Sequence, residues 1–394
     1  MSDTYLYILI LIAIACGFVM GRRSVRPKPE ETSTSLSKGY FKGLNFLLNE
    51  EADSAVDTFI QSLEVNPETL ETHLALGNLL RRKGEVDRAI KVHQNLLARP
   101  SLSAEHHHQA QLELARDFIK AGLLDRAERL LQELVESSPE LKRTALELLI
   151  EIYRDEKEWE KAIHAVNLLV GRRFSKMPPK WGVMQSHFCC ELAEVALGNN
   201  DYLSARRYLR QALNYHRDSV RASLLWGGLE ARLGHHKEAL KILIKIPQQD
   251  ADYLPEAVSL ICQCYEALDD QRGLFRFLTQ ALEEHPSNSL ILTVAQKIQQ
   301  SRDDEAAASF IGQHLKERPS IKGLSRLVEL HLDHTQGTAK ENLELLKQMV
   351  DKLLDTKPAY RCQRCGFNGN QLHWLCPSCK TWGSVKAIKG VEGE

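Results

Sequence analysis

The chain has 394 residues, with 52 acidic and 51 basic side chains and a formal net charge of −1. Because the charges balance, no global electrostatic signal for nucleic acid exists, and we expect no nucleic-acid partner. Hydrophobic residues make up 43% of the chain and only 13 residues are proline, a composition that is typical of a folded helical protein and excludes a largely disordered one.

The first predicted element is a transmembrane signal anchor at residues 1–21. Residues 4–21 carry no charge, and about 17 helical residues are just long enough to cross the hydrocarbon core of a bilayer. A cleaved signal peptide is the alternative, but it normally has positive charge before its apolar run. Here the basic residues follow that run: Arg22, Arg23, Arg26 and Lys28. The positive-inside rule therefore predicts a single-pass protein whose body faces the cytoplasm.

Residues 22–36 contain Pro, Ser, Thr and charges without an apolar period, which predicts a flexible cytoplasmic tether. Residues 37–355 predict an all-α tetratricopeptide-repeat solenoid of about eight to nine helical hairpins. A small residue recurs there at intervals of 34 to 43 residues, four of the seven being 34: Ala55, Ala89, Ala127, Ala162, Ala205, Ala239, Gly273 and Ala307. A period near 34 is typical of paired antiparallel helices. The longest interval contains residues 174–181, where we expect a loop or bend.

A solenoid of this type has a groove lined by the first helix of each hairpin. The repeat frame places six polar residues on or near that face: Asn78, Arg82, Arg116, Lys120, Arg154 and Arg232. Side chains in such positions are more often solvated than bound to a ligand. We therefore treat these six as weak candidates for contact with a protein partner.

Residues 356–394 predict a small rubredoxin-like metal-binding domain. Two Cys-x-x-Cys pairs can surround one metal ion with four sulfurs: Cys362, Cys365, Cys376 and Cys379. Zinc and iron both accept this tetrahedral set, so the metal is one ion of either element. His373 is a neighbour rather than a ligand, and four aromatic residues are expected to cover the site: Tyr360, Phe367, Trp374 and Trp382. A structural or partner-docking role is favoured over electron transfer.

Catalytic motifs are missing from the sequence, which has no glycine-rich phosphate loop, no His-Glu-x-x-His and no Gly-x-Ser-x-Gly. We therefore predict no enzymatic activity. The pairs Cys189-Cys190 and Cys262-x-Cys264 fall inside helical patterns and are expected to be packing residues of a reduced chain.

An anchor followed by basic residues, a tetratricopeptide body and a terminal Cys-x-x-Cys-Gly…Cys-Pro-x-Cys motif together resemble the lipopolysaccharide assembly protein B family of Gram-negative bacteria. The resemblance covers essentially the whole chain. It implies the four cysteines as metal ligands and the bacterial inner membrane as the location, with the N-terminus in the periplasm. The metal-binding segment differs from full rubredoxins because it is shorter and has Lys380 where a glycine often follows the last cysteine.

The resemblance further implies a non-enzymatic adaptor that regulates lipopolysaccharide synthesis. Its implied partners are a membrane-anchored AAA+ zinc protease, the deacetylase that commits precursors to lipid A, and other assembly and sensor proteins of the inner membrane; a homo-oligomer is left open. In this mechanism the repeats hold the deacetylase for degradation, and the metal-binding domain packs on the last helices. The alternatives are a generic membrane-tethered scaffold for envelope-assembly complexes and an iron-containing redox protein.

Overall fold

The structure is a computed structural model that describes residues 12–20, 42, 45–46, 54, 58, 70–100, 102–171 and 178–394. Residues 12–20 are helical, whereas the rest of the predicted anchor, and the tether, lie outside the described residues. Among the helices that are described, none is both long and apolar enough to cross a membrane. The chain divides into two compact units, residues 1–145 and 146–394.

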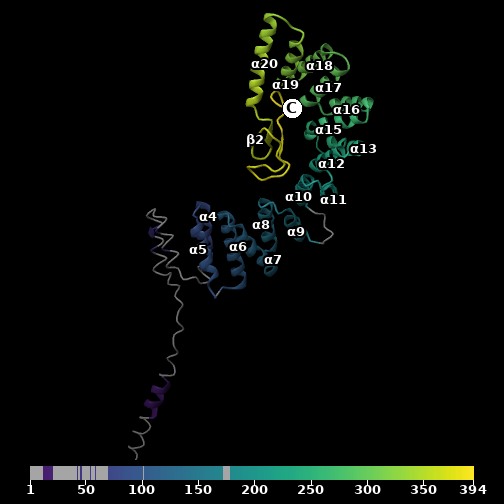
Figure 1. The fold of residues 1–394 in the computed structure, drawn as a ribbon. Helices are drawn as coiled ribbons and strands as arrows, with labels where there is room; N and C mark the ends of the chain where they lie inside the picture. Colours follow the sequence, from purple (N-terminus) through teal and green to yellow (C-terminus); the bar gives the residue numbers. More distant parts are fainter. Residues whose placement is uncertain are drawn as a thin grey trace, which may run out of the picture. The chain divides into compact units, whose positions relative to one another are not determined.

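The described part of the first unit is helical (Figure 1). Its helices are α4 (Leu70–Lys83), α5 (Val86–Leu97), α6 (Ala104–Ala121), α7 (Leu124–Ser137) and the beginning of α8 (Lys142–Asp155). Consecutive helices pack as antiparallel pairs because each has one apolar face, which it buries against its neighbour.

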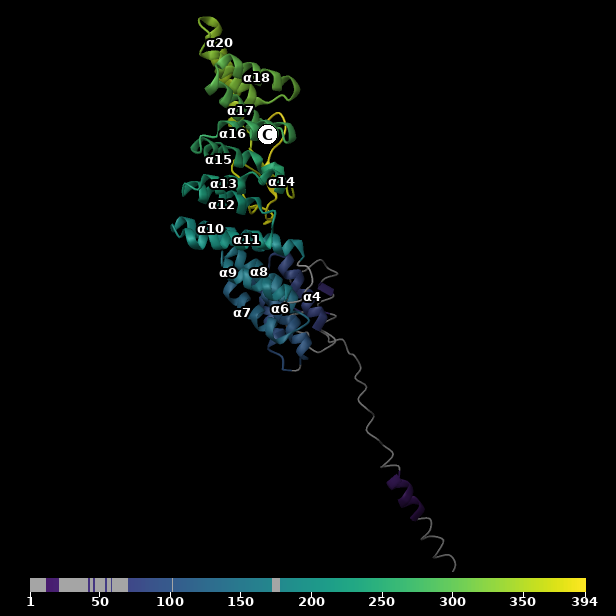
Figure 2. The same ribbon diagram turned by 90° about the vertical axis from the view of Figure 1, so that its right-hand side faces the viewer.

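The second unit also consists of paired helices up to Thr356 (Figure 2). Its helices are α9 (Trp159–Val170), α10 (Pro179–Gly198), α11 (Tyr202–Tyr215), α12 (Val220–Arg232), α13 (His236–Leu243), α14 (Ile246–Asp250), the 3₁₀ turn η1 (Ala251–Tyr253), α15 (Leu254–Ala267), α16 (Gln271–Glu284), α17 (Asn288–Ser301), α18 (Asp304–Glu317), α19 (Ile321–Leu332) and α20 (Thr338–Thr356). Of the loop predicted at 174–181, residues 172–177 lie outside the described part, and α10 begins at Pro179.

The recurring small residue lies near the start of the second helix of its pair. Ala55 is outside the described residues; the others are Ala89 in α5, Ala127 in α7, Ala162 in α9, Ala205 in α11, Ala239 in α13, Gly273 in α16 and Ala307 in α18. All of these alanines are fully buried. A larger side chain would push the crossing helices apart, so the sequence period marks one structural position of each hairpin.

The turn between the two helices of a pair also repeats. It contains a residue with positive φ in six cases: Gly84, Gly122, Lys157, Asn200, Gly234 and Asp269. This conformation ends the first helix and redirects the chain into the second. These six hairpins therefore share a turn geometry even where the sequence does not supply glycine.

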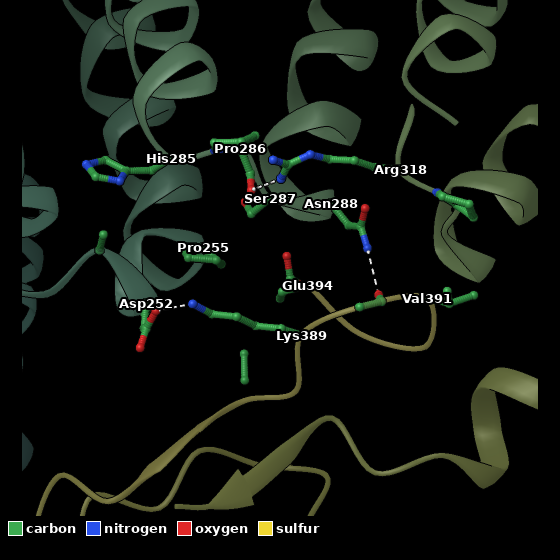
Figure 3. Close-up of a pocket in the computed structure, with 14 residues that line it drawn as sticks. Asp252, Pro255, His285, Pro286, Ser287, Asn288, Arg318, Lys389, Val391 and Glu394 are labelled. Carbon is green, nitrogen blue, oxygen red and sulfur yellow. Dashed lines mark hydrogen bonds and ion pairs between the residues drawn. The ribbon is translucent and has the colours of Figure 1, made fainter. Parts of the chain in front are cut away.

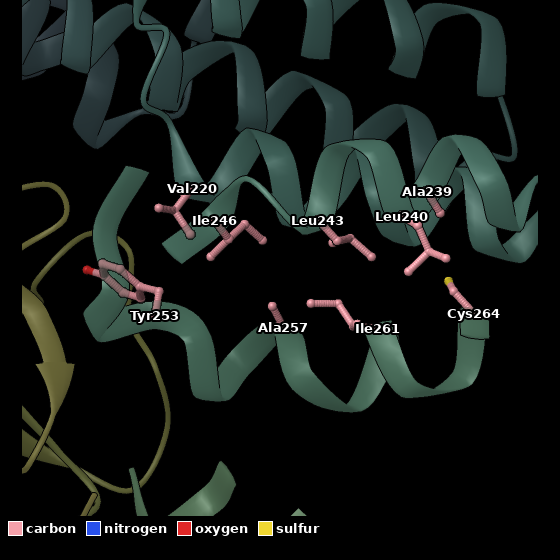
Figure 4. Close-up of a cluster of buried hydrophobic side chains, with 9 residues drawn as sticks. All are labelled: Val220, Ala239, Leu240, Leu243, Ile246, Tyr253, Ala257, Ile261 and Cys264. Carbon is pink, nitrogen blue, oxygen red and sulfur yellow. The ribbon is translucent and has the colours of Figure 1, made fainter. Parts of the chain in front are cut away.

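A buried apolar cluster joins α12, α13, α14, η1 and α15 in the second unit (Figure 4). Its members are Val220, Ala239, Leu240, Leu243, Ile246, Tyr253, Ala257, Ile261 and Cys264. Trp374 and Leu372, from the C-terminal segment, pack against the same cluster. The core of these repeats is therefore continuous with the segment that carries the cysteines.

Three short strands form an antiparallel sheet after α20: β1 (Tyr360–Cys362), β2 (Asn368–Gly369) and β3 (Val385–Ala387), in the order β2-β1-β3. Tyr360 pairs with Gly369 on one side and with Ala387 on the other. We call residues 360–387 the knuckle and residues 388–394 the tail. The sheet brings both Cys-x-x-Cys turns to one end of the knuckle.

Candidate metal centre and its docking on the repeats

The four predicted cysteines converge in the knuckle. One sulfur from each of Cys362, Cys365, Cys376 and Cys379 lies within 4.8 Å of all the others. Cys362 Sγ is 3.7 Å from Cys379 Sγ, and Cys365 Sγ is 3.6 Å from Cys376 Sγ. Four sulfurs at about 2.3 Å from one ion would be about 3.8 Å apart, so the donor set fits one tetrahedral metal ion.

Two equivalent turns position these sulfurs. In the first, the Gly366 N–H donates to the Cys362 carbonyl at 3.0 Å, and Gly366 has φ +77°. In the second, the Lys380 N–H donates to the Cys376 carbonyl at 3.0 Å, and Lys380 has φ +52°. Lys380 therefore occupies the left-handed position for which glycine is favoured, which explains why glycine often follows the last cysteine of such motifs.

The surroundings of Cys362 favour its thiolate. Burial by itself would raise the pKa of this thiol, but the Ser384 hydroxyl and the N–H groups of Cys365 and Arg364 outweigh that effect and lower the pKa to about 6. A hydrogen bond with Thr381 likewise lowers the pKa of Cys379. Burial raises the pKa of Cys376 to about 11, so a bound cation would have to drive its deprotonation.

Trp382 connects the knuckle to the middle of the repeats. Its ring is only 8% exposed and stacks on His187 of α10, with 4.7 Å between the ring centroids. Trp159 at the start of α9 and Phe188 of α10 meet the same ring edge-on, at 6.3 Å and 6.0 Å. Burial, with the charge of Arg221 adding to it, lowers the pKa of His187 to about 3, so the stacked imidazole is neutral at pH 7.

Arg221 of α12 is a second contact between repeats and knuckle. Its guanidinium lies 5.9 Å from the ring of Trp374 and 5.7 Å from that of Trp382, within the range of cation–π attraction. The same group forms ion pairs with Glu191 and Glu194 at 2.8 Å and 2.9 Å. These carboxylates hold the buried cation in the orientation that contacts both indole rings.

Tyr253 of η1 contacts strand β3 of the knuckle and the residues just before it. Its ring stacks on Trp374 at 5.1 Å, and its hydroxyl lies 3.2 Å from the Gly383 carbonyl and 3.1 Å from the Val385 carbonyl. Lys386 forms ion pairs with Asp250 and Asp252 at 2.8 Å and 2.7 Å. Backbone and side chains of the knuckle are therefore both recognised by this repeat.

Two expectations about this region are confirmed only in part. Tyr360 and Phe367 do pack around the buried cysteines, but Trp374 and Trp382 face the repeats because their large apolar rings are buried there instead. The expected packing of the metal-binding domain on the last helices is confirmed only for the tail, which lies at the starts of α17 and α19. The knuckle itself contacts α9, α10, α12, η1 and α15.

The predicted groove residues of the first unit belong to two groups. Arg81 donates to Asn78 at 2.5 Å and pairs with Glu113 and Asp117, while Arg116 pairs with Glu113, so Asn78 and Arg116 share one polar network. Two others, Arg82 and Lys120, are exposed in the last turns of α4 and α6. Basic residues favour helix C-termini because of the helix dipole, so this placement does not by itself indicate a ligand.

The two candidates of the second unit are not brought together. Arg154, near the end of α8, lines a cavity of about 520 Å³ with Lys180, Arg364 and Lys380. Arg232 is exposed at the end of α12. As partner contacts, all six residues stay predictions.

Sequence reasoning missed the residues that receive the knuckle: Trp159, His187, Arg221 and Tyr253. Each lies in or beside a helical pattern, where an aromatic or long side chain is normally interpreted as core or surface. The sequence offered one indication of this docking, the two tryptophans Trp374 and Trp382. A segment of about 30 residues cannot bury two indole rings by itself, so they need a partner surface. By contrast, Cys189, Cys190, Cys262 and Cys264 are buried, as predicted.

The fold and the site define a non-catalytic tetratricopeptide-repeat scaffold that carries a rubredoxin-like four-cysteine knuckle on its repeats. Family models agree: one described as a rubredoxin metal binding domain matches residues 360–387, and models of the tetratricopeptide repeat match 42–101, 112–178 and 196–264. The relatives are assembly proteins, which is consistent with a scaffold rather than an enzyme.

Lipopolysaccharide assembly protein B of Escherichia coli K12 is 36% identical, with 98% of this chain and 99% of that protein covered. The protein of the same name from Haemophilus influenzae is 35% identical, with 98% of each covered. The chain belongs to the lipopolysaccharide assembly protein B family. A crystal structure of a tetratricopeptide repeat protein from Parabacteroides merdae is a distant match (16% identity, TM-score 0.34, 72% of this chain and 99% of that one), and the assignment does not depend on it.

Proposed function

We propose that this chain is an inner-membrane adaptor that promotes degradation of the lipid A-committing deacetylase by a membrane-anchored AAA+ zinc protease, and so regulates lipopolysaccharide assembly. The observation that carries the proposal is the end-to-end similarity to proteins named for lipopolysaccharide assembly. A repeat scaffold without a catalytic motif supports a role in bringing proteins together. Other assembly and sensor proteins of the inner membrane are further partners in this proposal.

The proposed anchor at residues 1–21 places the N-terminus in the periplasm and the repeats in the cytoplasm. Confinement to the membrane raises the effective concentration of a held client beside a protease in the same membrane, without any new contact. The tether at residues 22–36 supplies the reach. The adaptor therefore increases the rate of encounter rather than the chemistry of proteolysis.

The knuckle has a structural part in this proposal. One zinc or iron ion held by the four sulfurs would lock both cysteine turns, and those turns position Trp374 and Trp382 against the repeats. Metal binding is then coupled to the docking of the knuckle across four successive repeats. The donor set does not choose between the two metals.

The adaptor role is tested by the half-life of the deacetylase after rapid depletion of this protein, in cells with and without the protease. A longer half-life that depends on the protease is expected. A chain without residues 1–21, produced at native level, should fold but lose this control. An unchanged deacetylase half-life after depletion would leave a generic membrane-tethered scaffold as the better description.

The metal assignment is tested by elemental analysis of the purified full chain. Cys362→Ser combined with Cys365→Ser should remove the metal, whereas Ser378→Ala, an exposed change in the second turn, should retain it. Unchanged metal content in the double variant would refute the assigned ligands. Visible ferric–thiolate absorbance that cycles with a cellular reductase would favour the redox alternative.

A further inference from the structure

The tail lies across the first turns of α17 and α19, which are the first helices of two successive hairpins (Figure 3). Asn288, the first residue of α17, donates its side-chain amide to the Gly393 carbonyl at 2.7 Å. Ile321, the first residue of α19, donates its backbone N–H to the Val391 carbonyl at 2.9 Å. These two contacts recognise the backbone of the tail, which an unrelated peptide would also present.

One acidic side chain fixes the end of the tail. The Glu394 carboxylate accepts hydrogen bonds from the Ser289 backbone N–H at 2.8 Å and the Ser289 hydroxyl at 2.6 Å, and it pairs with Lys322 at 2.9 Å. Burial alone would raise the pKa of this carboxyl, but the bonds from Ser289 and Lys322 outweigh it and lower the pKa. We call Ser289 and Lys322, which hold this carboxylate, the seat. The seat is therefore selective for a carboxylate.

The seat is built from the same positions of two repeats. Pro286–Ser289 and Pro319–Lys322 occur 33 residues apart in the sequence, and each begins with Pro-Ser. Ser287 accepts from the Leu290 N–H and Ser320 from the Gly323 N–H, so both serines cap their helices. The two capped helix starts present N–H groups side by side, an arrangement that suits a peptide carrying negative charge.

A cavity of about 520 Å³ remains beside the tail. Its lining includes Pro255, His285, Pro286, Arg318, Pro319 and Val391 (Figure 3). The tail does not fill it, because Gly390 has no side chain and the side chain of Val391 is 51% exposed. Three prolines, Pro255, Pro286 and Pro319, give this mixed wall an apolar part, which is complementary to a larger apolar side chain than that of Val391.

We propose that the α17–α19 surface is a binding site for a peptide segment of a partner protein, in which an acidic side chain occupies the Glu394 seat and a neighbouring large apolar side chain fills the cavity. The tail occupies this site in cis and must leave before the partner binds. Its polar contacts, with little apolar burial, make such an exchange feasible. A second copy of the chain is disfavoured as the occupant because its tail would leave the same cavity empty.

This inference rests on the adaptor role for its biological meaning, but its test involves neither the deacetylase nor the protease. The probe is a labelled peptide with the sequence of residues 386–394, titrated by fluorescence anisotropy against the full, metal-loaded chain in detergent. Glu394→Gln should bind it at least about tenfold more tightly than the wild-type chain, because the weakened tail competes less. Gly393→Ala releases the tail by another route, since its new Cβ would lie 1.8 Å from the Ile388 carbonyl oxygen.

Lys322→Ala, added to the Glu394→Gln chain, should weaken binding about tenfold, whereas Lys316→Ala, an exposed change on α18, should not. A probe with phenylalanine at position 391 should bind several-fold more tightly because it fills the cavity. Equal binding to wild-type and released chains, or no binding at about 1 mM, would overturn the proposal. A wild-type dimer that Glu394→Gln dissociates would assign the seat to a second copy instead.

Discussion

Trp382→Ala is the most informative change for the docking of the knuckle on the repeats. Its indole ring is 8% exposed and touches rings from two helices, His187 and Phe188 of α10 and Trp159 of α9. Trp382 is not one of the proposed metal ligands. The variant therefore separates the docking of the knuckle from metal binding.

The expected loss follows from the buried area. A buried tryptophan removes about 200 Å² of surface from water, which corresponds to about 5 kcal/mol at about 25 cal/mol per Å². Replacement of a buried Trp or Phe by alanine typically costs about 3–5 kcal/mol, because neighbouring side chains relax into part of the cavity. We expect the free energy of unfolding of the second unit to fall by about 3–5 kcal/mol.

The assay is urea denaturation followed by far-ultraviolet circular dichroism, with hydrogen–deuterium exchange of the native state measured in parallel. Exchange should rise in the knuckle and in α10, while metal content stays unchanged. Trp226→Ala is the matched control, because Trp226 is a partly buried tryptophan of α12 whose indole N–H donates to Glu230. It should destabilise the repeats less and leave exchange in the knuckle unchanged.

A loss below about 1 kcal/mol together with wild-type exchange in the knuckle would refute this reasoning. It would mean that the Trp382 ring contributes no docking energy and that the ion pairs of Lys386, with the tail, hold the knuckle. Loss of metal from the variant would also contradict the separation of docking from metal binding.

Three further outcomes are expected. Tyr253→Phe should cost about 1–2 kcal/mol, because the two carbonyls that share its hydroxyl proton lose their donor, and Tyr265→Phe in α15 should cost less in the same denaturation assay. Lys380→Gly should stabilise the metal-loaded knuckle by about 0.5–1 kcal/mol in thermal unfolding, because glycine relieves the positive φ; a destabilised variant would contradict this. Hydrogen bonds from Arg206, opposed by burial, lower the pKa of Glu230 from 4.5 to about 2. The ionised carboxylate therefore contributes its full stabilisation of the fold above pH 4.5, and this contribution is lost as pH falls toward 2. Glu230→Gln should therefore cost about 2–3 kcal/mol at neutral pH and little near pH 2; parallel pH profiles of the two proteins would refute the assigned pKa.

The repeat fold could be predicted from the sequence because each hairpin needs one small residue where its helices cross. That requirement is local and periodic, so Ala89, Ala127 and the later members of the series identify the second helix of each pair. The four metal-binding candidates were equally accessible, since Cys-x-x-Cys pairs bring sulfurs together by short-range turn geometry. In both cases the determining residues lie close together in the sequence, within one hairpin or within 18 residues of the chain.

Only the tertiary structure decided where the knuckle docks and what its aromatic residues touch. Trp382 meets His187, which is 195 positions earlier in the chain, and Tyr253 recognises carbonyls about 130 positions later. Such contacts depend on how successive repeats are stacked, and no local period records this. The sequence by itself thus determined the repeat unit and the set of sulfur donors, whereas the docking surface and the seat of the tail arise from long-range packing.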